Sequence, residues 1–140
     1  MGRTTTVNFN NFEYYTSSSF FNVLIFNDYV VKIPKHHSVK ERYRLKEIVE
    51  IQNYLADNIE NCLPCKLIEG MIVMPKAKGK RLDSFSEEEQ LKFRGMLEEL
   101  RKKINDLGID IIDIYAVKNS FYDEETGKLT YIDYCGVGRI

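Results

Sequence analysis

Two aspartates interrupt apolar runs in the last third of the chain, and such carboxylates are candidate ligands for a cation. Asp113 lies within the segment IDIIDIY, and Asp133 lies within TYIDYCG. A carboxylate is unfavourable inside a strand-forming run, so each aspartate is either a ligand or part of a strand end at the surface. Asn119 follows Asp113 closely and offers a neutral oxygen. Because carboxylate and amide oxygens are ligands that Mg2+ takes, Asp113, Asn119 and Asp133 together indicate a cation site.

A lysine inside an apolar run is the second chemical feature. Lys32 lies within YVVKI, and strand alternation places it on the same face as Val30 and opposite to Val31. An unpaired buried ammonium group is costly, so a buried Lys32 must reach an acidic or polar partner. The alternative is an edge-strand lysine whose amino group extends to water.

Strand-forming segments fill the first third of the chain, because these segments are rich in aromatic and β-branched residues. The turn at residues 27–28 separates two of the runs, and Pro34 ends the second because proline donates no ladder hydrogen bond. We expect strands at residues 8–15, 20–26 and 29–33.

Two helices are expected from their first residues and their apolar spacing. Ser38 precedes Glu41 by three residues, and Ser86 precedes Glu89 by three, which is the capping-box pattern. Apolar residues then recur at helical spacing on one face of each segment. They are Ile48, Ile51 and Leu55 in a helix over 38–57, with Ile59 continuing the spacing just beyond it, and Phe93, Met96, Leu97, Leu100, Ile104 and Leu107 in a helix over 86–107.

The segments that follow the two helices are predicted to form short strands. A hairpin is expected at residues 66–68 and 71–74, a strand at 109–117, and a second hairpin at 121–122 and 129–134. Strands at both ends with two helices between them predict an α+β domain in which a helix covers a sheet.

Composition narrows the class of protein. The 140 residues suit one domain, and 44% hydrophobic with 29% charged residues is typical of a globular chain. A net charge of −1 favours neither a nucleic-acid partner nor a membrane surface. Three cysteines without an export signal favour a reducing, cytoplasmic location, and Cys62 and Cys65 are expected to be free thiols.

The order of these elements resembles the protein-kinase-like fold over most of the chain. The resemblance implies a single domain over residues 1–140. Residues up to about 77 would form an N-lobe of antiparallel sheet plus C-helix, and about 78–140 a reduced C-lobe of one long helix and a β-hairpin. Lys32 looks like the phosphate-binding lysine. Glu47, with Glu50 second, looks like the C-helix glutamate that pairs with it.

The same resemblance assigns roles to the three oxygen-bearing residues. Asp113 is similar to the catalytic base, while Asn119 and Asp133 fall near the positions that hold magnesium. The family transfers a phosphoryl group from ATP by positioning it and neutralising its charge. ATP and Mg2+ are therefore the implied cofactors. The implied nucleotide-binding residues are Val23, Val30, Lys32, Met74, Pro75, Lys76 and Ala77.

The sequence also departs from the kinase pattern. The three glycine places of the phosphate-binding loop carry other residues, at Thr16, Ser18 and Phe21. Ile111 and Ile112 stand where the family has histidine and arginine. Few residues follow Asp133, so we expect a unit reduced to its nucleotide cleft, without an activation segment.

Two functions remain in competition. The first is a minimal ATP- and Mg2+-dependent protein kinase of serine/threonine type, which acts on a protein substrate. The second is an inactive pseudokinase-type module that binds and regulates a partner protein. The departures favour the second function, and the ordered survival of Lys32, Glu47, Asp113, Asn119 and Asp133 favours the first.

Overall fold

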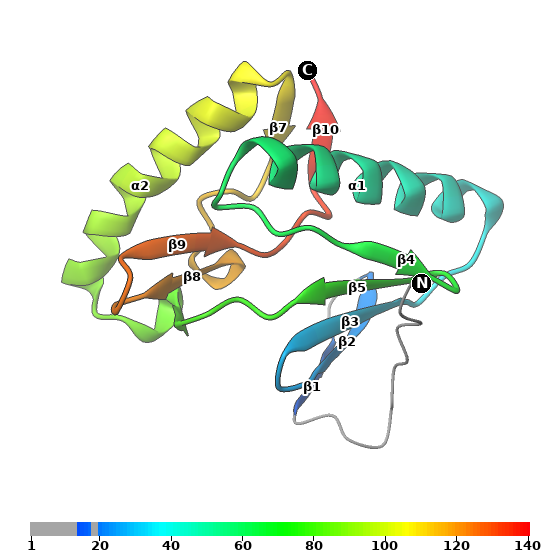
Figure 1. Ribbon diagram of the computed structural model, residues 1–140, viewed down its shortest axis with the longest axis horizontal. Helices are drawn as coiled ribbons and strands as arrows, with labels where there is room; N and C mark the ends of the chain where they lie inside the picture. Colours follow the sequence, from blue (N-terminus) through cyan, green and yellow to red (C-terminus); the bar gives the residue numbers. More distant parts are fainter. Residues whose placement is uncertain (1–13, 18–19) are drawn as a thin grey trace, which may run out of the picture.

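A five-stranded antiparallel sheet forms one end of the molecule. The computed structural model describes residues 14–17 and 20–140, so most of the strand expected at 8–15 and the glycine place at Ser18 lie outside the described residues. The strand order is β1-β2-β3-β5-β4 (Figure 1). The strands are β1 (Tyr14–Ser17), β2 (Phe21–Ile25), β3 (Tyr29–Pro34), β4 (Lys66–Ile68) and β5 (Met71–Pro75).

The sheet buries apolar side chains on both faces, as the alternation in β3 predicts. Val31 and Ile33 belong to a smaller apolar cluster on one face. Val30 packs on the opposite side against the main core. Lys32 shares the face of Val30, so its amino group is directed toward the rest of the molecule rather than toward the smaller cluster.

Helix α1 (Val39–Asn58) follows β3 and contacts β4 and β10. Its N-cap is Ser38, whose side chain accepts a hydrogen bond from the Glu41 amide at 3.2 Å, as expected from the sequence. Its buried residues recur at helical spacing, and Leu55 is fully buried. The helix is therefore fixed against the core along one face.

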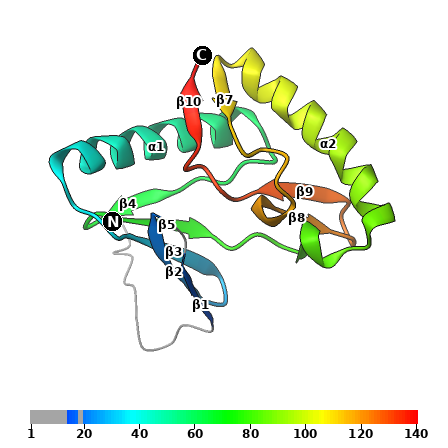
Figure 2. The ribbon, with the colours of Figure 1, turned by 180° about the vertical axis from the view of Figure 1, so that it is seen from behind.

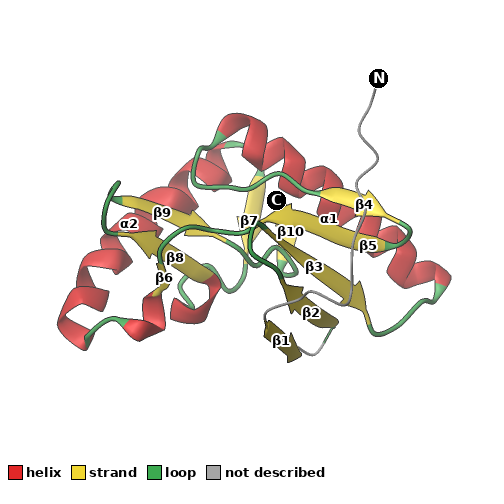
Figure 3. Ribbon diagram, turned by 60° about the horizontal axis from the view of Figure 1, so that its bottom comes forward, coloured by secondary structure: helices red, strands yellow, loops and turns green. Residues whose placement is uncertain are grey.

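The second part of the chain surrounds helix α2 (Glu87–Asp106), which begins with the expected capping box of Ser86 and Glu89. The short strand β6 (Lys80–Arg81) pairs with β8 (Ser120–Asp123), and β8 pairs with β9 (Lys128–Tyr131). A 3-10 turn, η2 (Leu82–Ser84), precedes α2, and another, η3 (Val117–Asn119), precedes β8. Figure 3 shows α2 with β8 and β9 at one end, and the five-stranded sheet with α1 at the other.

Strands β6, β7 and β10 differ from the expectations, and the differences at β7 and β10 are linked. The expected strand at 109–117 is only β7 (Ile109–Ile111), after which the chain turns and exposes Ile112. β7 pairs with β10 (Val137–Arg139), a strand that the local pattern does not predict. Figure 2 shows β7 and β10 together beside α1. Among the described residues, no helix is long and apolar enough to cross a membrane.

Candidate functional site

The amino group of Lys32 contacts the segment that follows β9. Lys32 Nζ donates a hydrogen bond to the backbone carbonyl of Ile132 at 3.1 Å. Ile132 directly precedes Asp133, so this bond joins β3 to the aspartate segment from the far end of the chain. A lysine within an apolar strand thus finds a polar partner, although the partner is a carbonyl and not a carboxylate.

Asn119 lies between the segments of the two aspartates. Its side-chain amide donates to the backbone carbonyl of Asp113 at 3.2 Å. Its own backbone carbonyl accepts from the Ile132 amide at 2.9 Å. The Ile112 amide also donates to the Gly136 carbonyl at 3.3 Å, which ties the Asp113 turn to the chain beyond Asp133. The structure therefore brings together the backbone segments that carry all three predicted oxygen-bearing residues.

Tyr131 lies beside this group and was not singled out from the sequence. Its side chain is fully buried, and the Asn119 side chain lies within reach of its hydroxyl, although the geometry is not that of a well-formed hydrogen bond. Burial raises the pKa of Tyr131, the charges of Asp133 and Asp113 raise it further, and the nearby Asn119 amide lowers it. The hydroxyl is therefore protonated and close to both aspartates. A tyrosine at the end of a strand gives no sequence signal that its hydroxyl lies beside Asn119 and the two aspartates.

The oxygen atoms near Asp133 fit a magnesium ion. Asp133 Oδ1 accepts from the Cys135 amide at 3.1 Å, and the bond from Asn119 to the Asp113 carbonyl uses the nitrogen of the Asn119 side chain and not its oxygen. Within residues 14–17 and 20–140, no three His, Cys, Asp or Glu side chains form a metal cluster. Mg2+ does not need such a cluster, because it is commonly held by one or two carboxylates, phosphate oxygens and water.

The expected pairing of Lys32 with Glu47 is wrong for this structure. Glu47 instead forms ion pairs with Arg44, three residues earlier on α1, and with Arg139 of β10 at 3.9 Å. Two guanidinium groups therefore take the carboxylate that the resemblance assigns to Lys32. Glu50, the second choice, is exposed.

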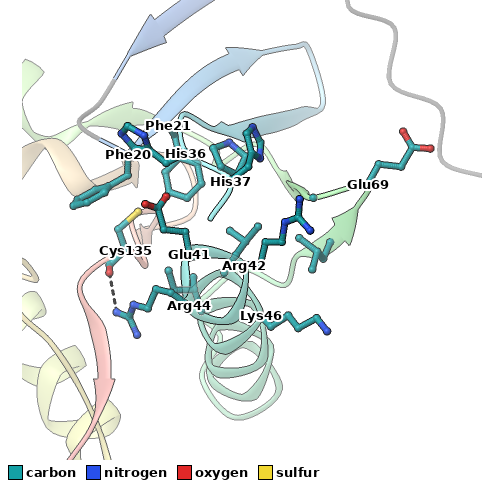
Figure 4. A pocket seen from close by; sticks show the side chains of 15 residues that line it. Phe20, Phe21, His36, His37, Glu41, Arg42, Arg44, Lys46, Glu69 and Cys135 are labelled. Atoms are coloured by element: carbon teal, nitrogen blue, oxygen red, sulfur yellow. Dashed lines mark hydrogen bonds between the residues drawn. The ribbon is translucent and has the colours of Figure 1, made fainter. Parts of the chain in front are cut away.

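Arg44 is a second residue that sequence reasoning missed. Its Nη2 donates to the carbonyls of Cys135, at 3.1 Å, and Val137, at 2.6 Å. Figure 4 shows the Arg44 side chain reaching from α1 to Cys135. Arg44 thus links α1 to the segment just after Asp133, which is a long-range contact without a local sequence signal.

The apolar residues predicted to surround a nucleotide share one region of the sheet. Val23 lies opposite Lys32 across the β2–β3 pair, and Val30 lies opposite Met74 across the β3–β5 pair. Such cross-strand neighbours have adjacent side chains on one face. These four residues therefore form a continuous patch that includes the Lys32 amino group.

The three predicted hinge residues after β5 differ in whether their backbone amides are free to donate a hydrogen bond to a ligand. The Lys76 amide is already bonded to the Asp28 carbonyl at 3.1 Å, so it does not offer a free donor. No hydrogen bond within the described residues uses the Ala77 amide. Pro75 ends β5 and is exposed. Of the three predicted hinge residues, Ala77 is therefore the one with a free amide donor.

A pocket of about 650 Å³ lies apart from the predicted nucleotide residues (Figure 4). It is bounded by the first turns of α1, the end of β3 and the turn between β4 and β5, and none of the predicted nucleotide residues lines it. Cys135 is the point at which this pocket approaches the segment of Asp133. The sequence pattern did not predict this pocket.

The three cysteines are free thiols, as expected for Cys62 and Cys65. Burial raises the pKa of each of these two to about 11. Burial and then the charge of Asp133 raise the pKa of Cys135 to about 12. At neutral pH all three therefore stay in the neutral thiol form, which is a poor nucleophile.

Comparisons with known proteins identify the fold. No protein family and no curated protein matches the sequence. The structure matches the bifunctional kinase-methyltransferase WbdD with a TM-score of 0.62 at 15% identity, over 96% of this chain and 36% of that one. It matches the Rio2 kinase from Chaetomium thermophilum with a TM-score of 0.63 at 14% identity, over 91% of this chain and 48% of that one. A complex of WbdD with the kinase inhibitor LY294002 matches with a TM-score of 0.56 at 18% identity, over 91% of this chain and 33% of that one.

The chain thus spans about a third to a half of the solved structures that it matches. At these identities the likeness concerns the fold and not the activity. An antiparallel sheet with one helix packed beside it, followed by the α2 region, agrees with that likeness. The described part of this chain has an α+β, protein-kinase-like fold.

Proposed function

We propose that this protein is a minimal kinase-like phosphotransferase that uses ATP and Mg2+ to phosphorylate serine or threonine hydroxyls of a protein substrate in the cytoplasm. The observation that carries the proposal is the bond from Lys32 to the carbonyl before Asp133, because it brings a lysine and a carboxylate segment 100 residues apart into contact. The Rio2 kinase neighbour, whose structure holds ADP and Mg2+, supports the same ligands here.

The chemistry of each predicted site residue suits a separate step in phosphoryl transfer. Lys32 binds the α- and β-phosphates as a positive point charge. Asp133 and Asn119 would hold Mg2+, which when bound neutralises phosphate charge. Asp113 is exposed and close to Asn119, so it can accept the proton of an incoming hydroxyl.

The adenine would lie on the patch of Val23, Val30 and Met74, and the Ala77 amide would supply a donor beside it. Val30 and Val23 are only partly buried, so they keep apolar surface that a base can cover. Met74 is buried and forms the floor of this surface. Pro75 and Lys76 complete the hinge through their backbone carbonyls.

Two substitutions test the roles of the aspartates. Asp113→Asn removes the proposed proton acceptor and leaves Asp133 and Asn119, the residues proposed here to hold Mg2+, so it should keep nucleotide binding and lower phosphoryl transfer roughly 10²–10⁴-fold. Asp133→Asn removes the charge beside the cation, so it should lose Mg2+-dependent nucleotide binding and transfer together. Binding is measured by calorimetric titration with ATP and Mg2+, and transfer by radiolabel incorporation into the protein itself and a generic acceptor.

Asp57→Asn provides the matched control, because Asp57 is an exposed aspartate near the end of α1 and far from this group in sequence. It makes the same change of charge and should leave both measurements unaltered. Wild-type protein that neither binds ATP with Mg2+ nor transfers phosphate would refute the proposal.

The pairing of Glu47 favours a second candidate, a pseudokinase-type module that regulates a partner protein. Arg44 and Arg139 hold Glu47, and Lys32 has no carboxylate partner in the described structure. A protein that binds nucleotide but gives no transfer to any acceptor, with wild type and Asp113→Asn alike, would favour this module over the enzyme.

A further inference from the structure

The pocket beside α1 plays no part in the proposed phosphotransferase site. Its volume of about 650 Å³ falls within the roughly 300–1,000 Å³ that is typical of sites for small molecules. None of the residues predicted to bind ATP or Mg2+ lines it. Its walls come from β2, the segment between β3 and α1, α1 itself and the β4–β5 turn, so segments distant in the sequence enclose one space (Figure 4). The pocket is therefore a candidate binding site in its own right.

Apolar side chains form much of the pocket wall. Leu45 and Ile48 of α1 and Phe21 of β2 line the pocket and are buried. Leu67 of β4 is 36% exposed and Phe20 is 63% exposed, so both keep apolar surface that an occupant can cover. Because removing such surface from water is favourable, the wall suits an occupant with an apolar body.

The charged side chains of the pocket are separated in space. Figure 4 shows Arg42 on the side of the β4–β5 turn and Glu41 on the side of Cys135. Glu69 and Lys46 extend away from the other side chains in the same view. The exposed side chain of Arg42 makes none of the described hydrogen bonds or ion pairs. Its guanidinium group can therefore bind the anionic group of an occupant without giving up a present partner.

The second arginine of the wall, Arg44, is already occupied. Its guanidinium group pairs with Glu47 and donates to two backbone carbonyls after Asp133. Arg42 is therefore the arginine in the wall that is available to a ligand. The imidazole rings of His36 and His37 also line the pocket and carry N–H donors for the same anion.

We propose that this pocket binds a small amphipathic anion, a molecule with an aliphatic or aromatic body and one carboxylate or phosphate group. The apolar body lies against Phe21, Leu45 and Leu67, and the anionic group binds Arg42. A few polar groups beside a largely apolar wall are what fix the orientation of such a ligand. The inference does not depend on the proposed phosphotransferase activity, because it uses none of the residues assigned to ATP or Mg2+.

The test uses two fluorescent probes that brighten in apolar sites. Anilinonaphthalene sulfonate is an aromatic anion, and phenyl-naphthylamine has the same rings without the charge. Arg42→Gln should weaken binding of the sulfonate about fivefold and keep binding of the neutral probe within about twofold of wild type, because it removes the charged contact and leaves the apolar wall. Leu67→Gln should weaken binding of both probes, because both cover its apolar surface.

Lys46→Gln and Glu41→Gln are the matched controls for charge. Lys46→Gln removes the same charge as Arg42→Gln from a side chain that extends away from the pocket, so sulfonate affinity should stay within about twofold of wild type. Glu41→Gln removes a negative charge from the other side of the pocket, so it should not weaken sulfonate binding. An equal loss in Arg42→Gln and Lys46→Gln would overturn the proposal, as would a wild-type protein that binds no sulfonate or an Arg42→Gln variant that binds it unchanged.

Displacement of the bound sulfonate then identifies the anionic group. Decanoate and decyl phosphate, used below the concentrations at which they form micelles, present one apolar chain with either a carboxylate or a phosphate. Decanol presents the same chain without charge. We expect at least one of the two anions to displace the sulfonate, and decanol to displace it much more weakly. Failure of both anions, or displacement by decanol that equals theirs, would overturn the proposal.

Discussion

Replacing Arg44 with glutamine should destabilise the fold through the contact between α1 and the segment after Asp133. The Nη2 atom of Arg44 donates to the carbonyls of Cys135 and Val137, and Val137 is buried. A hydrogen bond from a charged donor contributes about 1.5–3 kcal/mol. The Arg44 side chain is 41% exposed, so water can partly replace it. We therefore expect a loss of about 2 kcal/mol, near the lower end of that range for a shared donor.

Urea unfolding at neutral pH measures this loss, and thermal melting checks it. For a chain of this size, about 2 kcal/mol corresponds to a fall of about 6 °C in melting temperature. Arg42→Gln is the matched control, because Arg42 is an exposed arginine in the same first turns of α1 whose side chain makes none of the described hydrogen bonds. Both variants remove one positive charge near the helix N-terminus, so the helix dipole affects them alike. A difference of less than about 0.5 kcal/mol between them would refute the anchoring role of Arg44.

Two further predictions concern a glycine turn and the buried thiols. Gly79→Ala should destabilise by more than about 2 kcal/mol in urea unfolding, because Gly79 has φ +94° and an added Cβ would lie 2.1 Å from the Tyr122 carbonyl oxygen. Gly95→Ala, in open space on α2, should instead stabilise by about 0.5–1 kcal/mol, and loss in both would contradict the steric argument. Raising the pH from 9 to 11 should lower the free energy of unfolding, because the unfolded chain loses its thiol protons near 9.0 while Cys62 and Cys65 keep theirs to about 11. Each thiol contributes up to about 1.4 kcal/mol per pH unit over that interval, and a C62A/C65A variant with an unchanged slope would refute this assignment.

The sequence predicted the elements whose causes are local. The capping residue Ser38 and the apolar spacing after it fixed the start and the buried face of α1, and Ser86 did the same for α2. The expected turn at Glu69-Gly70 is confirmed, and both of its residues have positive φ. Gly70 suits this turn because glycine adopts the left-handed conformation without steric cost. These features depend on residues a few positions apart, which a sequence displays directly.

Pairings between distant segments were harder to predict. β10 contains Val137, Gly138 and Arg139, too short a run to show alternation, and it becomes a strand because β7 offers an unpaired edge. The same holds for β6, whose two residues pair with β8. In both cases the partner strand determines the structure more than the segment's own residues do.

The mistaken partner of Glu47 has the same origin and a functional consequence. Glu47 forms ion pairs with two arginines, Arg44 of α1 and Arg139 of β10, and β10 is the strand that was not expected. Arginine binds carboxylates through a planar fork and is less strongly hydrated than lysine, so it competes well for a partly exposed carboxylate. Lys32 then takes the Ile132 carbonyl. Under the proposed function, an incoming phosphate would offer Lys32 a full negative charge in exchange for a neutral carbonyl, so nucleotide binding would not first require an ion pair to break. Under the proposed function, phosphate binding would therefore depend on the position of Lys32 beside the Asp133 segment rather than on its pairing with Glu47.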